Sequence, residues 1–350
     1  MKKGTLKLQD GFELEGVSFG KDISTSGEVV FATGMVGYPE SMTDPSFTGQ
    51  ILVFTYPLIG NYGVFDSEFF ESSKIHVKGI IVCNYIDSPS HHSQKQTLSE
   101  WLKKEGIPAL EISDTRLITQ KLRDSGTMLG KILIDKSDEE TEQYDPNMEN
   151  LVSQVSSKEV LTQGNGGKTI VLIDCGAKKN IARSLLARGV RVITVPWDYD
   201  FMENKPDHKI DGVMISNGPG DPKLAKETIK IIKKTMEAKI PIFGICLGNQ
   251  LLALAAGGDT FKLKYGHRSQ NQPCLLSNSK RCYITTQNHG FAVGKIPNGF
   301  KEWFTNANDG TNEGIIHETL PFMSVQFHPE SYPGPHDTNW LFDFFLERIK

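Results

Sequence analysis

The 350-residue sequence lacks any uninterrupted apolar run of the ~18 residues that a membrane-spanning helix needs. Its first residues, MKKGTLKLQDGFELEG, carry two lysines but no apolar segment behind them, so we expect no secretory signal peptide. The net charge is −4, without the clustered basic face typical of nucleic-acid-binding proteins. These absences predict a cytoplasmic protein that binds neither membranes nor nucleic acids.

Cysteine is scarce, and its spacing argues against two kinds of site. The five cysteines are Cys83, Cys175, Cys246, Cys274 and Cys282, with no C-x-x-C pair among them. In a reducing compartment, an odd number of scattered cysteines argues against a disulfide framework and against a zinc site. His91 and His92 lie in a polar segment without a third ligand. We therefore expect no metal and no cofactor in this chain.

Residues 136–167 differ in composition from the segments on either side. KSDEETEQYDPNMEN is acidic and nearly free of aliphatic residues, and SSKEVLTQGNGGK is polar and rich in glycine. This composition is typical of a solvated linker, here with one short helix at NLVSQVSS. The length suits two domains, so we predict a first domain over 1–135 and a second over 168–350.

The second domain alternates runs typical of buried strands with amphipathic helical segments. KTIVLIDC, VRVITVP, DGVMIS and PIFGI have the strand pattern, and the helical segments between and after them include KKNIARSLLARG and LGNQLLALAAGG. This alternation predicts an α/β fold with a doubly wound, mostly parallel sheet. The first domain has short strand-like runs, such as GEVVFAT and VKGIIVCNY, and helical segments at TLSEWLKKEG and RLITQKLRDSG. It is predicted to be a smaller α/β domain.

Cys246 occupies a cramped position between a predicted strand and a predicted helix. Gly244 precedes it by two residues and Gly248 follows it by two, as expected for a nucleophile on a sharp turn where the backbone is crowded. The N–H groups at the start of the helix favour a thiolate, and that of Leu247 can hold an oxyanion. A buried structural cysteine remains the alternative, so a catalytic role requires a base.

His328 is the best candidate for that base. It directly follows the predicted strand FMSVQF, at the strand end where α/β sheets place their sites. Glu330 lies two residues further on and can fold back to fix the tautomer and orientation of the imidazole. The loop SNGPGDP follows another buried strand, and its Gly218 and Gly220 allow backbone N–H groups to approach a ligand beside Cys246. These residues together predict nucleophilic catalysis on a carbonyl.

The motifs GICLGNQ, SNGPGDP, QNHGF and FHPE, in that order, resemble the class I (triad) glutamine amidotransferases, which have a flavodoxin-like fold. TGMVGYPESMTDPSFTGQILVFTYPLIGNYG and DTRLITQKLRDSGTMLGKI resemble the small subunit of carbamoyl-phosphate synthase. This resemblance covers nearly the whole chain. It implies a glutaminase that passes ammonia to a large subunit, which makes carbamoyl phosphate from bicarbonate and ATP for arginine or pyrimidine biosynthesis. ATP and a divalent metal are then expected in the large subunit, to which the first domain docks.

The resemblance also implies roles for individual residues. Cys246 is the nucleophile, His328 the acid and base, and Glu330 its orienting partner. The residues implied to hold glutamine are Ser46, Gly218, Gly220, Leu247, Gln250, Asn288, Gly290 and Phe291. The sequence departs from the usual family pattern at Ala32, Pro39, Asn249, Ser269, Gln270 and Gln272. None of these departures removes a member of the triad.

Two other functions remain open from the residues alone. A stand-alone hydrolase of γ-glutamyl amides, or a cysteine peptidase, could use the same triad, but it leaves the first domain without a role. A catalytically silent scaffold for a large partner would have no need of an intact Cys246, His328 and Glu330. The coupled glutaminase is therefore the leading hypothesis.

Overall fold

The computed structural model describes residues 2–134, 141–204 and 206–349. It divides into two compact units, Met1–Glu149 and Asn150–Lys350. The division falls inside the segment predicted to be a linker, of which residues 136–140 lie outside the described residues. Among the described residues, no helix is long and apolar enough to cross a membrane.

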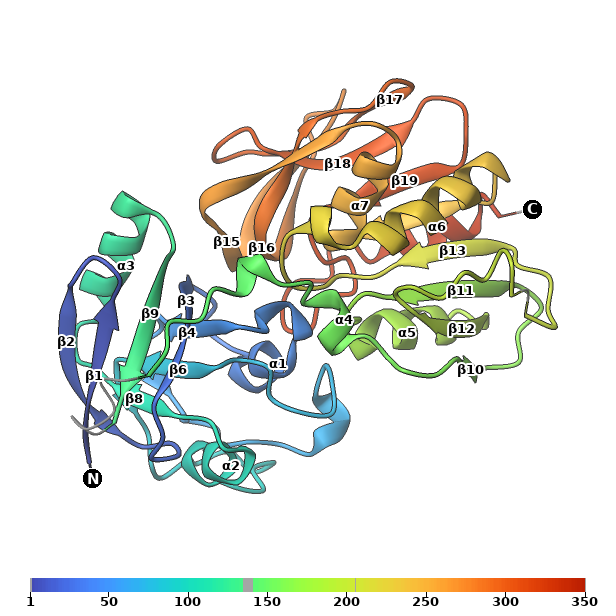
Figure 1. Ribbon diagram of the computed structural model, residues 1–350. Helices are drawn as coiled ribbons and strands as arrows, with labels where there is room; N and C mark the ends of the chain where they lie inside the picture. The colour runs from blue at the N-terminus through green and yellow to red at the C-terminus, as the bar shows by residue number, and fades with distance from the viewer. Residues whose placement is uncertain (1, 135–140, 205, 350) are drawn as a thin grey trace. The chain divides into compact units, whose positions relative to one another are not determined.

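The first unit is built around a closed barrel of seven strands (Figure 1). Around the barrel the strands are β1 (Lys3–Leu8), β2 (Glu13–Ser18), β8 (Ala109–Glu111), β6 (Gly79–Val82), β4 (Gln50–Phe54), β3 (Thr25–Ala32) and β9 (Met128–Leu133). The shorter β5 (Leu58–Ile59) and β7 (Asn84–Tyr85) pair with each other. The α-helices are α1 (Tyr38–Thr43), α2 (Leu98–Glu105) and α3 (Thr115–Ser125).

Local sequence signals account for the helices of this unit. Thr97 and Glu100 form a reciprocal capping box at the start of α2, and Gly106 ends the helix in the left-handed conformation. Asp114 caps α3 through the backbone N–H of Leu117. The predicted helices are thus confirmed. The barrel was not predicted, because its closure depends on pairing between strands far apart in the sequence, such as β1 with β9.

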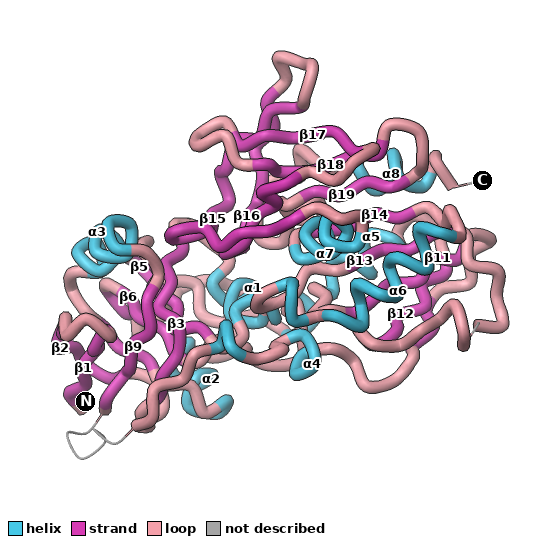
Figure 2. Tube along the Cα trace, turned by 45° about the horizontal axis from the view of Figure 1, so that its top comes forward, coloured by secondary structure: helices cyan, strands magenta, loops and turns pink. Residues whose placement is uncertain are grey.

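The second unit contains a ten-stranded sheet (Figure 2). Across the sheet the strands are β10 (Leu161–Gln163), β12 (Arg191–Pro196), β11 (Thr169–Asp174), β13 (Gly212–Ile215), β14 (Ile242–Ile245), β19 (Phe322–Val325), β18 (Asn312–His317), β17 (Phe300–Asn306), β15 (Asp259–Leu276) and β16 (Cys282–Lys295). The strands from β12 to β19 in this order run parallel, which confirms the predicted doubly wound core. The remaining strands add antiparallel edges on both sides.

Helices cover both faces of the parallel strands. They are α4 (Val152–Val155), α5 (Lys179–Leu186), α6 (Lys226–Glu237), α7 (Leu247–Ala255) and α8 (Trp340–Leu346), and α6 and α7 lie together in Figure 1. Alternate residues of β11 enter different cores: Val171 packs in the cluster that contains α6 and α7, and Leu172 in the cluster that contains α5 and α8. Strands buried on both faces explain the near-continuous apolar runs of the sequence.

Candidate active site

Cys246 lies between β14 and α7 with an unusual backbone, φ 54° and ψ −101°. The glycines on either side are required by close contacts. A Cβ on Gly244 would lie 2.4 Å from the Gly248 carbonyl oxygen, and a Cβ on Gly248 would lie 2.4 Å from that of Ile215. The cysteine N–H donates to the Val325 carbonyl at 2.8 Å, which fixes the turn against β19. The strained turn predicted from the sequence is therefore present.

The Cys246 thiol is buried and donates a hydrogen bond of 3.6 Å to the carbonyl of Asn288. Leu247 and Gly248 form the first turn of α7, where backbone N–H groups have no partner within the helix. The start of the helix therefore offers donors beside the sulfur. Such donors suit an oxyanion that develops when a sulfur attacks a carbonyl.

His328 follows β19 and is held on both sides. Its backbone N–H donates to the Thr286 carbonyl at 2.9 Å, and its ring Nδ1 lies 2.6 Å from Glu330 Oε1. Both side chains are almost completely buried. Burial lowers the pKa of His328, but the negative charge of Glu330 beside it outweighs burial and holds that pKa above its ordinary value.

The ring Nε2 of His328 makes no hydrogen bond of ordinary geometry with the described residues. Because Nδ1 is engaged by Glu330, Nε2 is the ring atom left to act on a nucleophile. Cys246 and His328 are both held to the same segment of β16, Cys246 through Asn288 and His328 through Thr286. Nucleophile–base contacts are often loose before substrate binds. The structure thus brings together the three predicted catalytic side chains.

Lys178 is a member of this site that the sequence analysis missed. Its Nζ lies 3.2 Å from Glu330 Oε1 and donates to the Ser331 carbonyl at 2.5 Å. Burial raises the pKa of Glu330, but the positive charges of Lys178 and His328 outweigh it and hold that pKa below its ordinary value. Its place in the sequence could have indicated this role. Lys178 closely follows β11, at the sheet edge where the other site residues also lie.

The SNGPGDP loop packs closely against neighbouring backbone. A Cβ on Gly218 would lie 2.2 Å from the Cys175 carbonyl oxygen, and Gly220 has a φ of 83°. The buried Asn217 accepts a hydrogen bond of 2.9 Å from the Lys178 N–H. This loop is therefore held beside the residue that anchors Glu330, although its predicted contact with glutamine stays a prediction.

The remaining predicted glutamine-binding residues lie in both units. Gln250 Nε2 donates to the Phe291 carbonyl at 2.8 Å and to Gln326 Oε1 at 3.1 Å. It therefore ties α7 to the segment that contains Asn288 and Gly290. Ser46 lies in the first unit, where its N–H donates to Asp44. The roles of these residues in binding glutamine remain predictions.

Asn249, one of the departures from the family pattern, has a physical explanation here. Its Oδ1 accepts from Ser324 Oγ at 2.8 Å, and its Nδ2 donates to Gln326 Oε1 at 3.2 Å. The Asn249 side chain is fully buried and cannot bond to water, so these two hydrogen bonds satisfy its polar atoms instead. An amide at this position therefore satisfies its polar surroundings.

Comparison with known proteins assigns both units. Residues 171–348 match the family model of class-I glutamine amidotransferases, and residues 6–132 match that of the carbamoyl-phosphate synthase small chain, CPSase domain. The chain belongs to the carbamoyl-phosphate synthase small-chain family. This membership confirms the resemblance seen in the motifs.

Three relatives are similar to nearly the whole of this chain but differ in how much of their own length it covers. The carbamoyl phosphate synthase arginine-specific small chain of Neurospora crassa is 48% identical over 368 residues, covering 99% of this chain and 80% of that protein. Multifunctional protein URA2 of Saccharomyces cerevisiae is 48% identical over 390 residues, covering 99% of this chain. Multifunctional protein CAD of Squalus acanthias is 51% identical over 357 residues, covering 98% of this chain. The chain spans only 17% and 16% of these two multifunctional proteins.

Proposed function

We propose that this chain is the glutaminase subunit of a glutamine-hydrolysing carbamoyl-phosphate synthase. It hydrolyses glutamine to glutamate and ammonia, and the ammonia passes to a large subunit. That subunit combines ammonia with bicarbonate and ATP to form carbamoyl phosphate for arginine or pyrimidine biosynthesis. Family membership supports this proposal.

The observation that carries the proposal is the arrangement of Cys246, His328 and Glu330. The sulfur lies at the start of α7, and the imidazole near it is oriented by a buried carboxylate at 2.6 Å. A nucleophile, a base and an orienting group are the three parts that covalent acyl transfer requires. Each of them is held by packed, fully buried structure rather than by an exposed loop.

In the first half of the reaction, His328 Nε2 takes the proton of the Cys246 thiol, and the thiolate attacks the side-chain carbonyl carbon of glutamine. The tetrahedral oxyanion is held by the N–H groups of Leu247 and Gly220. Protonated His328 gives its Nε2 proton to the nitrogen that leaves as ammonia, and the C–N bond breaks. A γ-glutamyl thioester remains on Cys246.

In the second half, the now neutral His328 accepts a proton from water, which attacks the thioester carbonyl. The same N–H groups hold the second oxyanion, and the C–S bond breaks to release glutamate and the Cys246 thiolate. Glu330 stays ionised throughout and stabilises the imidazolium that forms in each cycle. Lys178 keeps Glu330 ionised through its buried charge.

The proposal assigns no cofactor to this chain and places ATP and a divalent metal in the large subunit. The first unit is the part proposed to dock to that subunit, since none of the triad residues comes from it. We also place the protein in the cytoplasm. The five free cysteines support a reducing compartment.

Glutamine hydrolysis by the purified chain, alone and with a matching large subunit, tests the proposal. We expect slow hydrolysis by the chain alone and faster turnover in the complex with ATP and bicarbonate. Cys246→Ser should abolish both, whereas Cys282→Ser, at an exposed cysteine, should change neither. Parental rates in Cys246→Ser, or equal rates with and without the large subunit, would contradict the proposal.

A further inference from the structure

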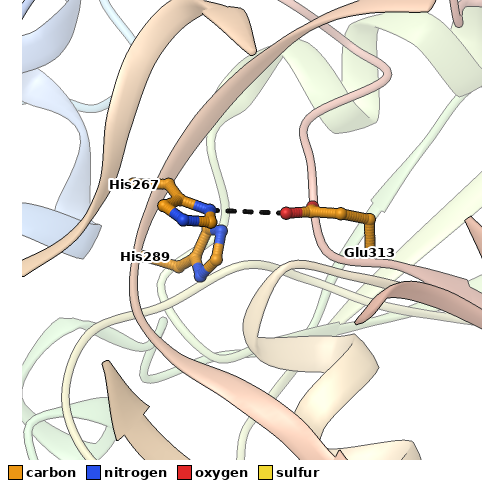
Figure 3. Close-up of side chains that lie close together, drawn as sticks. All are labelled: His267, His289 and Glu313. Carbon is orange, nitrogen blue, oxygen red and sulfur yellow. Dashed lines mark ion pairs between the residues drawn. The ribbon is translucent and has the colours of Figure 1, made fainter. Parts of the chain in front are cut away.

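We propose that His267, Gln287, His289 and Glu313 form a binding site for one divalent transition-metal ion of the Zn²⁺ type. His267 lies on β15, His289 on β16 and Glu313 on β18, and in Figure 3 their side chains converge. All three are buried, and one ligand atom from each lies within 4.8 Å of the others. Imidazole nitrogen and carboxylate oxygen are ligands that Zn²⁺ prefers.

The distances fit a tetrahedral ion. Bonds of about 2.0–2.1 Å to zinc imply ligand atoms separated by about 3.3 Å. His267 Nδ1 lies 3.4 Å from Glu313 Oε1 and 2.9 Å from Gln287 Oε1, and His289 Nε2 lies 3.2 Å from the same Gln287 oxygen. Gln287 Oε1 is therefore the proposed fourth ligand atom. Small shifts of the four side chains would bring all four ligand atoms to bonding distance from one ion.

The outer atoms of both imidazoles are held as they are in metal sites. A ligating histidine usually donates its other ring N–H to a carboxylate or a backbone carbonyl, which fixes the tautomer. His267 Nε2 lies 2.8 Å from Asp309 Oδ2, and His289 Nδ1 lies 2.8 Å from the Phe291 carbonyl oxygen. Each ring thus directs its remaining nitrogen into the cluster.

In the cluster, two acceptor atoms face each other and one buried oxygen lacks a hydrogen-bond partner among the described residues. Because His289 Nδ1 donates to a carbonyl, Nε2 of the neutral ring carries a lone pair, and it faces Gln287 Oε1, which is also an acceptor. Glu313 Oε2 is buried and has no hydrogen-bond partner among the described residues. A cation at the centre would satisfy His289 Nε2 and Gln287 Oε1, next to Glu313 Oε1, which also accepts from Asn306 Nδ2 at 3.0 Å. Turning the Gln287 carboxamide over, so that its NH₂ group faces the ring, is the alternative for the metal-free chain.

The site would stabilise a part of the fold next to the nucleophile. Gln287 and His289 flank Asn288, whose carbonyl accepts the hydrogen bond from Cys246. A metal that joins β15, β16 and β18 would therefore hold the Asn288 backbone in place. The ion would be structural, because Cys246, His328 and Glu330 supply the reacting groups.

Titration of the full-length chain with Co²⁺, after removal of metals with a chelator, tests the proposal. We expect one equivalent to bind with the intense visible absorption of four-coordinate Co²⁺. A sulfur-to-metal charge-transfer band should be absent, since the ligands are nitrogen and oxygen. Zn²⁺ should displace the Co²⁺. No saturable binding, an octahedral spectrum or a sulfur band would overturn the proposal, and none of these readouts requires a variant to fold.

Variants locate the ion. His267→Gln and Glu313→Gln should abolish the Co²⁺ spectrum, and Asp309→Asn should weaken binding about 10–100-fold because it removes the partner of a ligand. The double variant His91→Ala/His92→Ala is the matched control, since these stacked rings belong to the first unit and the cluster belongs to the second. A Co²⁺ spectrum that survives in the folded Glu313→Gln variant, or that disappears in the control, would refute the assignment.

Discussion

Lys178 and Glu330 form a buried ion pair, with 3.2 Å between Nζ and Oε1 and side chains that are 3% and 0% exposed. Glu330 in turn contacts His328, so a lysine that touches no reacting atom sets the charge of the group that orients the base. Removing one partner of such a pair leaves a buried charge uncompensated.

Lys178→Met should therefore lower both stability and activity. We expect the free energy of unfolding to fall by about 3–5 kcal/mol, the usual cost of breaking a buried pair. Denaturant titration and kcat/KM for glutamine hydrolysis measure the two effects. Lys223→Met, at an exposed pair with Asp259, is the control and should change neither. Equal behaviour of the two variants would contradict the role of Lys178.

Glu330→Gln should move the alkaline limit of activity to lower pH. The charge of Glu330 helps to hold the pKa of His328 above its ordinary value, so its removal lowers that pKa. Release of ammonia needs protonated His328, and activity is therefore lost as the pH rises through the His328 pKa. The pH profile of kcat/KM from neutral to alkaline pH measures the shift. An unchanged or upward-shifted limit is incompatible with this account.

Gly248→Ala should disrupt the turn that holds the nucleophile. The added Cβ would lie 2.4 Å from the Ile215 carbonyl oxygen, so the backbone must move. We expect a loss of about 1–3 kcal/mol in stability and, because a shift of 1 Å misplaces the sulfur, a loss of about 100-fold in kcat. Gly167→Ala, where no atom lies within 4 Å of the new Cβ, should match the parent. Full activity in Gly248→Ala would show that the tight turn is dispensable.

Asn249→Ala should destabilise the fold by about 1–3 kcal/mol, because it leaves the buried Ser324 hydroxyl without its acceptor and removes one of the two donors to Gln326 Oε1. Thermal and denaturant unfolding measure the effect. Asn308→Ala removes an exposed amide hydrogen bond and should have little effect. If both variants unfold alike, the buried amide contributes no more than an exposed one.

Charged substitutions on the first unit should weaken its proposed docking to the large subunit. Met35 and Val36 are adjacent apolar residues that are 64% and 57% exposed, and exposed apolar surface often marks an interface. Met35→Glu/Val36→Glu should weaken the complex, measured by co-purification, while glutamine hydrolysis by the chain alone persists. Phe261→Glu, in the second unit, is the control. Undiminished binding by the double variant would exclude this patch.

The elements of the second unit were predictable because their signals are local. Strands of the parallel core are continuous apolar runs, and Gly244 and Gly248 mark a turn that tolerates no Cβ. His328 and Glu330 were predictable because they are neighbours in sequence, directly after a strand.

The features that escaped prediction depend on contacts between distant residues. Lys178 pairs with Glu330 more than a hundred residues away, and a lysine after a strand is ordinarily a surface residue. His267, His289 and Glu313 have no short metal-ligand spacing, so only the pairing of β15 with β16 and the position of β18 bring them together.

The most direct test of the glutaminase account is mass spectrometry of the chain quenched during glutamine turnover. The account predicts a glutamyl group attached through a thioester to the peptide that contains Cys246, and no such adduct in Cys246→Ser. A glutamyl adduct on another cysteine, or hydrolysis at the parental rate by Cys246→Ser, would contradict it.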